Sequence, residues 1–386
     1  MHAATIDLTA APFWLVLLFA AFILAPIAVV GTRSMAVSVV NITFLACILS
    51  TRQLVTTLIG VAIIYAAAKL LRNARLGIAI LLISIPTVLL LFAVHKVHGL
   101  STEWGIPGAP LLSTIGFSYV FLRLIDLGRP VFENGSRPPS LSETLNYLLP
   151  FHMLAGGPIQ SYGDFVRENT AVPLPTSQAL CLQHLDRLAT GLVKKFVIAQ
   201  TLEEVFLTGF RSEGLYFIFE AQVFYVWLYL DFSAYSDIAV GAGGLLGIHT
   251  PENFRAPLTA RNLIVFWERW HISLSLFIRR NIFLPIQLKL ARQFSNTSPI
   301  LIATIAFTSS FVACGLWHGI GVRFLLWGVF HAVGLSLVNF YRAGLQRRLG
   351  PKRAKEYLKN PVIRLVATLL TFEFVAASLV IVAYPI

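Results

Sequence analysis

The sequence predicts an all-α polytopic membrane protein with about ten to eleven transmembrane helices. Only 12% of its 386 residues are charged and 56% are hydrophobic, whereas soluble domains contain about 25% charged residues. A soluble globule of this composition would expose large apolar patches to water, which excludes a soluble enzyme. The third observation is a series of uncharged stretches of membrane-spanning length.

These stretches define the expected membrane spans. Seven of them are uncharged throughout, namely residues 8–32, 34–51, 53–68, 76–95, 104–122, 299–322 and 324–341. Residues 365–386 form a further span that contains only Glu373, and three apolar stretches are interrupted by charge or glycine, namely residues 188–207, 214–230 and 233–251. We predict one integral-membrane domain over residues 1–386, with peripheral N-terminal spans in residues 8–110 and a C-terminal span at about 365–386.

Charge placement predicts the orientation of the chain. Residues 1–13 contain Asp7 but no Lys or Arg, so they do not resemble a signal peptide and the first span is expected to stay in the protein. Residues 342–364 carry eight Lys and Arg residues against the single acid Glu356, which predicts a cytoplasmic loop. The net charge of +12 is therefore attributed to loops that face membrane lipids, and no nucleic-acid partner is expected.

The middle third departs from simple spans. In residues 150–165, Gly156, Gly157 and Pro158 predict a broken or re-entrant segment, because such backbone is tolerated at membrane depth only inside protein or beside a cavity. In residues 231–237, DFSAYSD, the carboxylates and hydroxyls should face a polar interior. Whether Asp231 and Asp237 serve function or only neutralise nearby arginines stays open at this point.

Residues 262–285 form the densest polar and aromatic segment, NLIVFWERWHISLSLFIRRNIFLP. At helical spacing Trp267, His271, Leu274 and Ile278 share one stripe, with Trp270 beside it, which predicts an amphipathic helix near the cytoplasmic interface. Taken alone, His271 is best interpreted as a structural histidine held between tryptophans.

A second histidine lies inside an uncharged stretch, in CGLWHG at residues 314–319. An ionisable side chain at this depth is a functional-site hypothesis, and neutral His318 suits the role of a base. The alternative is a hydrogen bond from His318 to a neighbouring helix, and for His331 a structural role is favoured. No metal site is predicted: His95 and His98 have no acidic or cysteine residue nearby, and Cys47, Cys181 and Cys314 show no CxxC spacing.

An ordered set of motifs then points to a family. FWERWHISLS at 266–275 is followed by GLWHG at 315–319. Further segments run in the same order, namely GGPIQSYGDF at 156–165, GLVKKFVIA at 191–199, DFSAYSDIAVG at 231–241, PENFRAPLTARN at 251–262 and LLWGVFHAV at 325–333. Over about residues 116–335, expected to form the core, this set resembles the membrane-bound O-acyltransferase family, in particular its bacterial branch that modifies alginate and teichoic acids.

The resemblance implies a helical fold with interfacial or re-entrant helices around a central polar funnel, in which an acyl group passes from a cytoplasmic thioester to an acceptor reached from outside. It assigns His318 to the buried catalytic histidine and His271 to the second, cytoplasmic-side histidine. The chain departs from the family at Arg279 and Arg280, where an acidic residue is common after the first arginine, and at Arg323, where a tryptophan is frequent.

Acyl transfer to a hydroxyl requires a base for its proton and donors for the oxyanion. His318 would supply the base and His271 would orient the thioester. The expected surroundings are apolar walls from Trp267, Trp270 and Trp317, phosphopantetheine contacts from Arg269 with Lys194 or Lys195, and funnel-lining Asp231, Tyr235, Ser236 and Asn253. No tightly bound cofactor is expected; the co-substrate would be acetyl-CoA or an acyl carrier protein.

The sequence thus favours transfer of a short acyl group, acetyl first, to an envelope or exported polysaccharide at the bacterial inner membrane. The acceptor would be reached directly or through an extracytoplasmic partner transferase. Alternatives are D-alanyl transfer to teichoic acid from a carrier protein, acylation of a lipid or small secreted metabolite, and secondary transport. A transporter would explain broken helices and midplane charges but does not require the two histidine motifs.

Overall fold

The computed structural model describes residues 11–24, 30–70, 117–132, 139–169, 177–207 and 215–383. Within these ranges the chain is helical, and its only β-type pairing is an isolated bridge between Phe254 and Trp270. The prediction of an all-α protein is therefore confirmed. The expected span at 76–95, most of that at 104–122, and the pair His95 and His98 lie outside the described residues.

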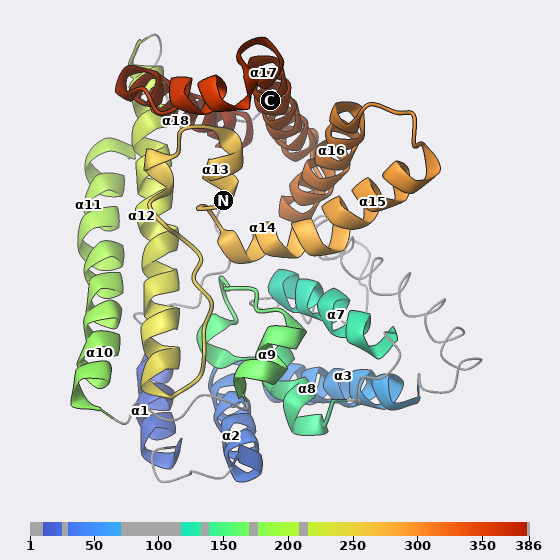
Figure 1. The fold of residues 1–386 in the computed structure, drawn as a ribbon. Helices are drawn as coiled ribbons and strands as arrows, with labels where there is room; N and C mark the ends of the chain where they lie inside the picture. Colours follow the sequence, from blue (N-terminus) through green and yellow to red (C-terminus); the bar gives the residue numbers. More distant parts are fainter. Residues whose placement is uncertain are drawn as a thin grey trace. The chain divides into compact units, whose positions relative to one another are not determined.

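The described helices follow one another along the chain (Figure 1). The first half contains α1 (Ala11–Leu24), α2 (Val30–Ile48), α3 (Thr51–Leu70), α7 (Phe117–Phe132), α8 (Leu141–Leu148), η1 (Phe151–Met153), α9 (Tyr162–Asn169) and α10 (Gln178–Val193). The second contains η2 (Lys194–Ala199), α11 (Gln200–Leu202), η3 (Glu203–Leu207), α12 (Leu215–Leu245), η4 (Pro257–Thr259), α13 (Leu263–Trp267), α14 (Ile272–Ile278), η5 (Arg279–Phe283), α15 (Leu284–Gln293), α16 (Pro299–His318), α17 (Val322–Tyr357) and α18 (Pro361–Ala383).

Four described helices are long and apolar enough to cross a bilayer, namely Thr51–Lys69, Pro299–His318, Val322–Tyr357 and Pro361–Ala383. A helix needs about 20 apolar residues to cross the hydrocarbon core. Shorter apolar helices cover Pro12–Ala21 and Thr32–Ile48. The chain is therefore a multi-pass membrane protein.

The chain forms two compact units, which are described separately. Unit 1 contains Met1–Gly191 and Tyr235–Pro251, and unit 2 contains Leu192–Ala234 and Glu252–Ile386. Helix α12 contributes its first part to unit 2 and its end to unit 1. The single domain that we expect from the sequence is not tested by this division.

Contacts between aromatic rings and close packing at a glycine hold unit 1 together. The ring centroids of Phe13 and Phe151 are 5.9 Å apart, and those of Phe44 and Phe151 are 5.6 Å apart. Gly241 of α12 lies against the backbone of α10, where an added Cβ would be 2.8 Å from Leu188 N. As predicted, helical structure ends before Gly156, Gly157 and Pro158 and resumes in α9.

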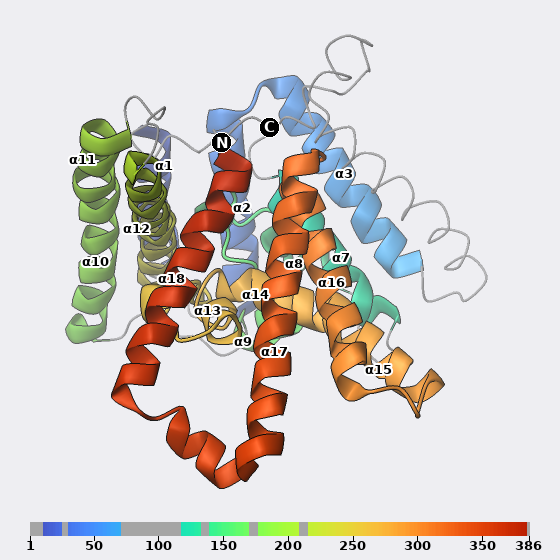
Figure 2. The same cartoon turned by 90° about the horizontal axis from the view of Figure 1, so that it is seen from above.

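In unit 2, α16 packs along α17, and α17 packs along α18 (Figure 2). Glycines allow the first contact: an added Cβ at Gly315 would collide with the carbonyl oxygen of Phe324, and one at Gly328 with that of Phe311. Helix α17 is kinked at Gly350, whose φ of 77° is a conformation that glycine adopts without steric cost. Pro351 follows this turn directly.

Two expectations about helices were wrong. The stretches 214–230 and 233–251 were expected as two separate spans, but a single helix, α12, runs from Leu215 to Leu245 through Asp231 and Asp237. Residues 262–285 were expected as one amphipathic helix, but they form α13, a non-helical break, α14 and η5. The break removes the stripe through Trp267 and His271, because His271 is in the left-handed region and not in a helix.

Candidate active site

In unit 2, a non-helical segment before α13 pairs with the break after it. Phe254 bridges Trp270, the N–H of Arg255 donates to the carbonyl of Arg269 at 3.0 Å, and the N–H of Ile272 donates to the carbonyl of Asn253 at 2.9 Å. These bonds hold the chain on both sides of His271, whose φ is 44° and ψ is 52°. The position of the imidazole is therefore set by backbone pairing between distant segments of sequence.

His271 is buried and its ring is oriented by Asn253. Its Nδ1 lies 3.2 Å from Asn253 Oδ1, an oxygen that also accepts the backbone N–H of Ser273 at 3.2 Å and the Ser273 hydroxyl at 2.7 Å. A backbone N–H can only donate, so this atom of Asn253 is an acceptor and His271 Nδ1 carries the proton. The lone pair of the neutral ring is then on Nε2, where it can accept a proton or polarise a ligand.

Burial keeps this ring neutral. Desolvation, followed by the smaller effect of the neighbouring His318 charge, lowers the pKa of His271 to about 3. The edge of the Phe232 ring contacts the imidazole, with centroids 4.8 Å apart. At physiological pH His271 is thus an uncharged, buried group beside an aromatic ring.

His318 is the last residue of α16 and is half-buried. Its ring contacts Trp317 edge-on at 4.7 Å and Trp327 at 5.3 Å between centroids. The structure therefore places it at the end of an apolar helix, electrostatically close to His271. Both histidines that the sequence singled out thus lie in unit 2 and interact electrostatically, and their catalytic roles stay predictions.

His331 differs from both because its two ring nitrogens are used in hydrogen bonds. Trp267 Nε1 donates to Nδ1 at 3.3 Å, and Nε2 lies 3.0 Å from the hydroxyl of Ser378. That hydroxyl donates onward to the carbonyl of Val375 at 2.7 Å. The contacts connect α13, α17 and α18 and support the structural role that the sequence favoured for His331.

The three expected wall tryptophans lie in different surroundings. Trp317 contacts His318, whereas Trp267 packs on Phe311 at 4.9 Å. Trp270 instead packs on Phe254 at 5.1 Å. All three are buried, and their role as apolar walls of the site stays a prediction.

Sequence reasoning missed Trp327. It is buried and its centroid lies 5.3 Å from His318, 4.7 Å from His331 and 6.1 Å from Trp267. It therefore separates the two histidines of α16 and α17. The sequence does contain a signal for it: Trp327 lies one helical turn before His331 in LLWGVFHAV, so the two side chains share a helix face.

The expected phosphate-binding lysine is already in an ion pair. Lys195 pairs with Asp231, and both side chains are partly buried, so neither is an unengaged charge in a funnel. Lys194 precedes it in η2. Arg269 donates from Nη1 to the hydroxyl of Thr259 at 3.0 Å. Asp237 forms an ion pair with Arg187 at 2.6 Å in unit 1, so the structural interpretation of both aspartates gains support.

Tyr235 and Ser236 belong to unit 1 and are described with it. Tyr235 donates to the carbonyl of His152 at 3.4 Å and its ring faces Gly156, while Ser236 is buried. Within either unit, the structure does not bring these two residues together with the histidines. Their expected place in a funnel stays a prediction.

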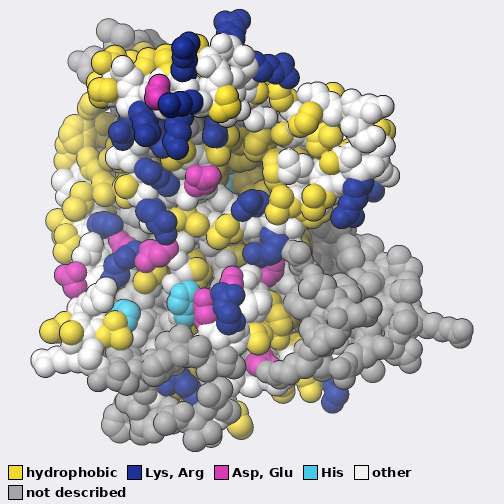
Figure 3. Space-filling view, viewed as in Figure 1, with side chains coloured by type: hydrophobic (Ala, Val, Ile, Leu, Met, Phe, Trp, Pro, Cys, Tyr) yellow, Lys and Arg dark blue, Asp and Glu magenta, His cyan; other side chains and the backbone are white. Residues whose placement is uncertain are grey.

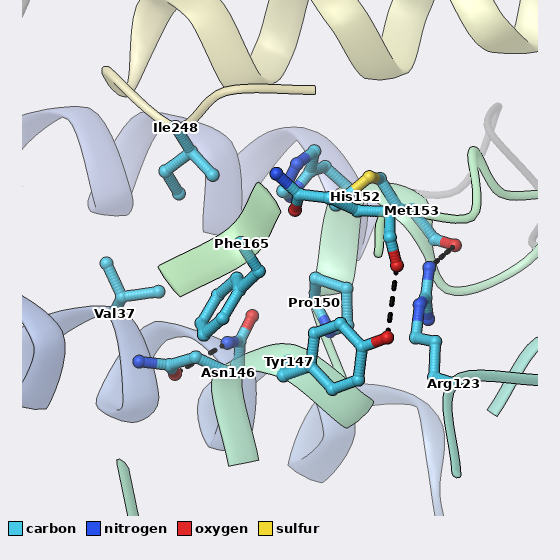
Figure 4. Close-up of a pocket in the computed structure, with 11 residues that line it drawn as sticks. Val37, Arg123, Asn146, Tyr147, Pro150, His152, Met153, Phe165 and Ile248 are labelled. Carbon is cyan, nitrogen blue, oxygen red and sulfur yellow. Dashed lines mark hydrogen bonds between the residues drawn. The ribbon is translucent and has the colours of Figure 1, made fainter. Parts of the chain in front are cut away.

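Unit 1 also contains a small cavity lined by both polar and apolar side chains (Figure 4). Arg123 is fully buried there and donates to the carbonyls of Leu148, Met153 and Pro158 at 3.0–3.3 Å. His152 Nε2 forms a hydrogen bond of 3.1 Å with Thr250 Oγ1. Burial lowers the pKa of His152 to about 3. The cavity has a volume of about 20 Å³, which fits one water molecule and not an acyl donor.

Comparison with known proteins shows which family the chain resembles. The family model described as the membrane-bound O-acyltransferase family matches residues 3–380. The chain is 26% identical to a teichoic acid D-alanyltransferase of Bacillus subtilis, over 70% of this chain and 68% of the relative. It is 32% identical to a peptidoglycan O-acetyltransferase of Helicobacter pylori, over 61% of this chain and 43% of the relative.

A third relative is named as a probable alginate O-acetylase of Pseudomonas putida. It is 29% identical to the chain, over 64% of the chain and 50% of the relative. The chain thus spans about half the length of the two acetylating relatives and about two thirds of the D-alanyltransferase.

Proposed function

Because the chain belongs to the membrane-bound O-acyltransferase family, and is therefore a membrane O-acyltransferase, we propose that it moves acetyl to a polysaccharide. The donor would be a thioester on the cytoplasmic side of the bacterial inner membrane. The acceptor would be a hydroxyl of an envelope or exported glycan, reached directly or through an extracytoplasmic transferase. Relatives named for O-acetylation of peptidoglycan and alginate support this choice of group and acceptor.

The observation that carries the proposal is the orientation of the buried, neutral His271 by Asn253, in the same unit as His318, with which it interacts electrostatically. In the proposed reaction, His318 removes the proton of the acceptor hydroxyl as its oxygen attacks the thioester carbonyl carbon. The C–S bond then breaks, and the departing thiolate receives the proton held by His318. His271 orients the thioester, and the surrounding tryptophans exclude water from it.

The test is turnover by the purified protein in nanodiscs with acetyl-CoA and an acetylated carrier protein as alternative donors. We expect His318→Ala to reduce transfer to glycan by at least about 100-fold, and His271→Ala to reduce it as well. His249→Ala is the matched control, because His249 pairs with Glu168 in unit 1, outside the proposed site. Wild-type rates in His318→Ala, or no transfer by the wild type with either donor, would overturn the proposal.

D-alanyl transfer to teichoic acid is a second candidate. It is favoured by one observation: the chain spans 68% of the D-alanyltransferase but only 43–50% of the acetylating relatives. A D-alanylated carrier protein added to the same assay separates the two candidates. Transfer from this donor in preference to acetylated donors would replace acetyl by D-alanyl in the proposal.

A further inference from the structure

The end of α17, the start of α18 and the turn between them, residues 342–364, form a strongly basic part of unit 2. This segment contains eight Lys and Arg residues against the single acid Glu356. All eight are exposed, namely Arg342, Arg347, Arg348, Lys352, Arg353, Lys355, Lys359 and Arg364. Figure 3 shows Lys and Arg side chains gathered on the part of the surface where Figure 1 draws this segment. We call residues 342–364 the basic connection.

The cations of the basic connection are not neutralised by carboxylates of the described chain. Among the residues that the structure describes, none of the eight forms an ion pair, and Glu356 forms none either. Eight like charges within 23 residues repel one another. Bound anions would relieve this repulsion and accept hydrogen bonds from the guanidinium and ammonium groups.

Both ends of the basic connection lead into candidate membrane spans, in α17 and α18. The uncharged part of α17 from Phe324 to Tyr341 rises about 27 Å at 1.5 Å per residue, close to the thickness of the hydrocarbon core. Arg342 therefore follows at the edge of that core. Arg364 lies in the first turn of α18, the helix that leads back into the bilayer. The basic connection thus begins and ends at one membrane surface.

A kink keeps the basic connection near this surface. Gly350 is non-helical and is followed by Pro351, and the segment after it crosses toward the start of α18 (Figure 2). The side chains of Tyr341 and Tyr357 form a hydrogen bond. An unkinked α17 would carry Tyr357 roughly 24 Å beyond Tyr341. The bond instead returns Tyr357 to the edge of the hydrocarbon core, so the cations around it lie at the depth of the lipid headgroups.

Exposed apolar and aromatic side chains lie among these cations. Tyr341, Leu349, Tyr357 and Val362 are 38–64% exposed. Tyrosine is typical of the membrane interface, where its ring contacts the apolar layer and its hydroxyl reaches the headgroups. A soluble acidic partner would be attracted by the cations alone. The mixture of cations with tyrosine and aliphatic side chains therefore favours a lipid surface as the partner.

We propose that the basic connection binds anionic phospholipid headgroups through their phosphate groups. Arginine and lysine both donate to phosphate oxygens, arginine with two parallel hydrogen bonds. A cluster of four to eight such cations beside a membrane helix attracts anionic lipid, and each cation strengthens binding about 5-fold. The inference depends on neither the acyl group nor the acceptor of the proposed reaction.

The experiment measures how strongly spin-labelled phosphatidylglycerol associates with the full chain, relative to spin-labelled phosphatidylcholine, in phosphatidylcholine bilayers. The wild type should prefer phosphatidylglycerol, and added salt should weaken the preference. Lys352→Gln with Lys355→Gln should lower the relative association constant by at least about 5-fold. Lys352→Arg with Lys355→Arg is the matched control, which keeps the charge and should keep the preference. Equal association of the two lipids with the wild type, or a wild-type preference in the glutamine variant, would overturn the inference.

Tyr357→Phe tests the geometry, because it removes the hydrogen bond to Tyr341 without a change of charge. A lower preference for phosphatidylglycerol in this variant supports the role of the returned segment. Thermal unfolding gives a second readout, since a lipid that binds only the folded chain stabilises it. Phosphatidylglycerol should raise the unfolding temperature of the wild type more than that of the Lys352→Gln, Lys355→Gln variant. Equal increases in both proteins would contradict lipid binding at these lysines.

An acidic soluble protein could contact the same cations. Binding of a purified acyl carrier protein is therefore measured in bilayers that contain only phosphatidylcholine, with the wild type and the Lys352→Gln, Lys355→Gln variant. If the variant loses the carrier protein but keeps the wild-type preference for phosphatidylglycerol, the basic connection docks a soluble partner and the inference is overturned. If carrier binding is the same in both proteins while the lipid preference falls, the inference holds.

Discussion

Asn253 Oδ1 lies 3.2 Å from His271 Nδ1 and accepts the backbone N–H of Ser273 at the same distance. The second bond identifies the amide oxygen, because only an oxygen can accept from that N–H. The first bond then places the imidazole proton on Nδ1. One fully buried amide thus determines which face of His271 is basic.

Removal of this amide should disturb chemistry more than folding. Asn253→Ala is expected to reduce turnover about 100-fold, the usual cost of misplacing a reacting group by about 1 Å. Asn253→Asp should raise the pKa of His271 from about 3, because a nearby carboxylate stabilises the imidazolium. Since the proposed mechanism requires the neutral ring, turnover in Asn253→Asp should fall as pH drops through the raised pKa. The measurement is the pH–rate profile between about pH 5 and 8.

Ser273→Ala is the control, since it removes only the hydroxyl contact to the same oxygen. It should keep the wild-type profile. An identical pH profile in the wild type and Asn253→Asp would contradict the tautomer assignment.

The hydrogen bonds of His331 should contribute to stability. His331→Phe leaves Trp267 Nε1 and the Ser378 hydroxyl without this partner, which costs about 1–3 kcal/mol of unfolding free energy per buried group. Ser378→Ala should cost about 1 kcal/mol, and the double variant should cost less than the sum because the two changes remove one shared bond. Thermal unfolding in detergent measures all three, and strict additivity would show that the bond contributes nothing.

Two ion pairs of equal length test whether burial increases the contribution of an ion pair to stability. Arg187–Asp237 and Arg167–Asp164 both measure 2.6 Å, but the Asp237 side chain is 7% exposed and that of Asp164 is 44% exposed. Asp237→Asn should therefore lower the unfolding free energy by about 2 kcal/mol, reduced from the usual buried-pair cost because Arg187 is partly exposed. Asp164→Asn should cost less than about 1 kcal/mol. Equal losses in chemical unfolding would refute the role of burial.

The contact of α10 with α12 should depend on Gly241. An alanine there would place its Cβ 2.8 Å from Leu188 N and 2.9 Å from the His184 carbonyl, so the two backbones must separate. We expect a loss of about 1–3 kcal/mol in thermal stability. Gly60→Ala in α3 meets no atom within 4 Å and should cause no loss, and a similar loss in both variants would argue against close backbone packing.

Local features of the fold were predictable from the sequence. The span that begins at Pro299 was expected because it is uncharged and long enough to cross a bilayer, and the break at Gly156–Pro158 was expected because glycine and proline interrupt helices. The interruption before His271 was not, since the spacing of Trp267, His271 and Leu274 fits a helix. Pairing with Asn253 and Arg255, distant in sequence, overrides this local preference.

The same limit applies to the site. His318 and His271 could be chosen from their motifs, but their partners come from other helices. Asp231 forms an ion pair with Lys195, which is 36 residues away in the sequence. Ser378 forms a hydrogen bond with His331, which is 47 residues away. No local pattern contains these pairings, so the sequence could not predict which of the candidate residues were already engaged in ion pairs or hydrogen bonds.

The left-handed backbone of His271 has a consequence for protein engineering. For residues other than glycine this conformation costs about 1–2 kcal/mol, and asparagine tolerates it better than most. A randomised library at position 271 should therefore separate two selections. Selection for expression yield would enrich glycine and asparagine, whereas selection for acyl transfer would retain histidine.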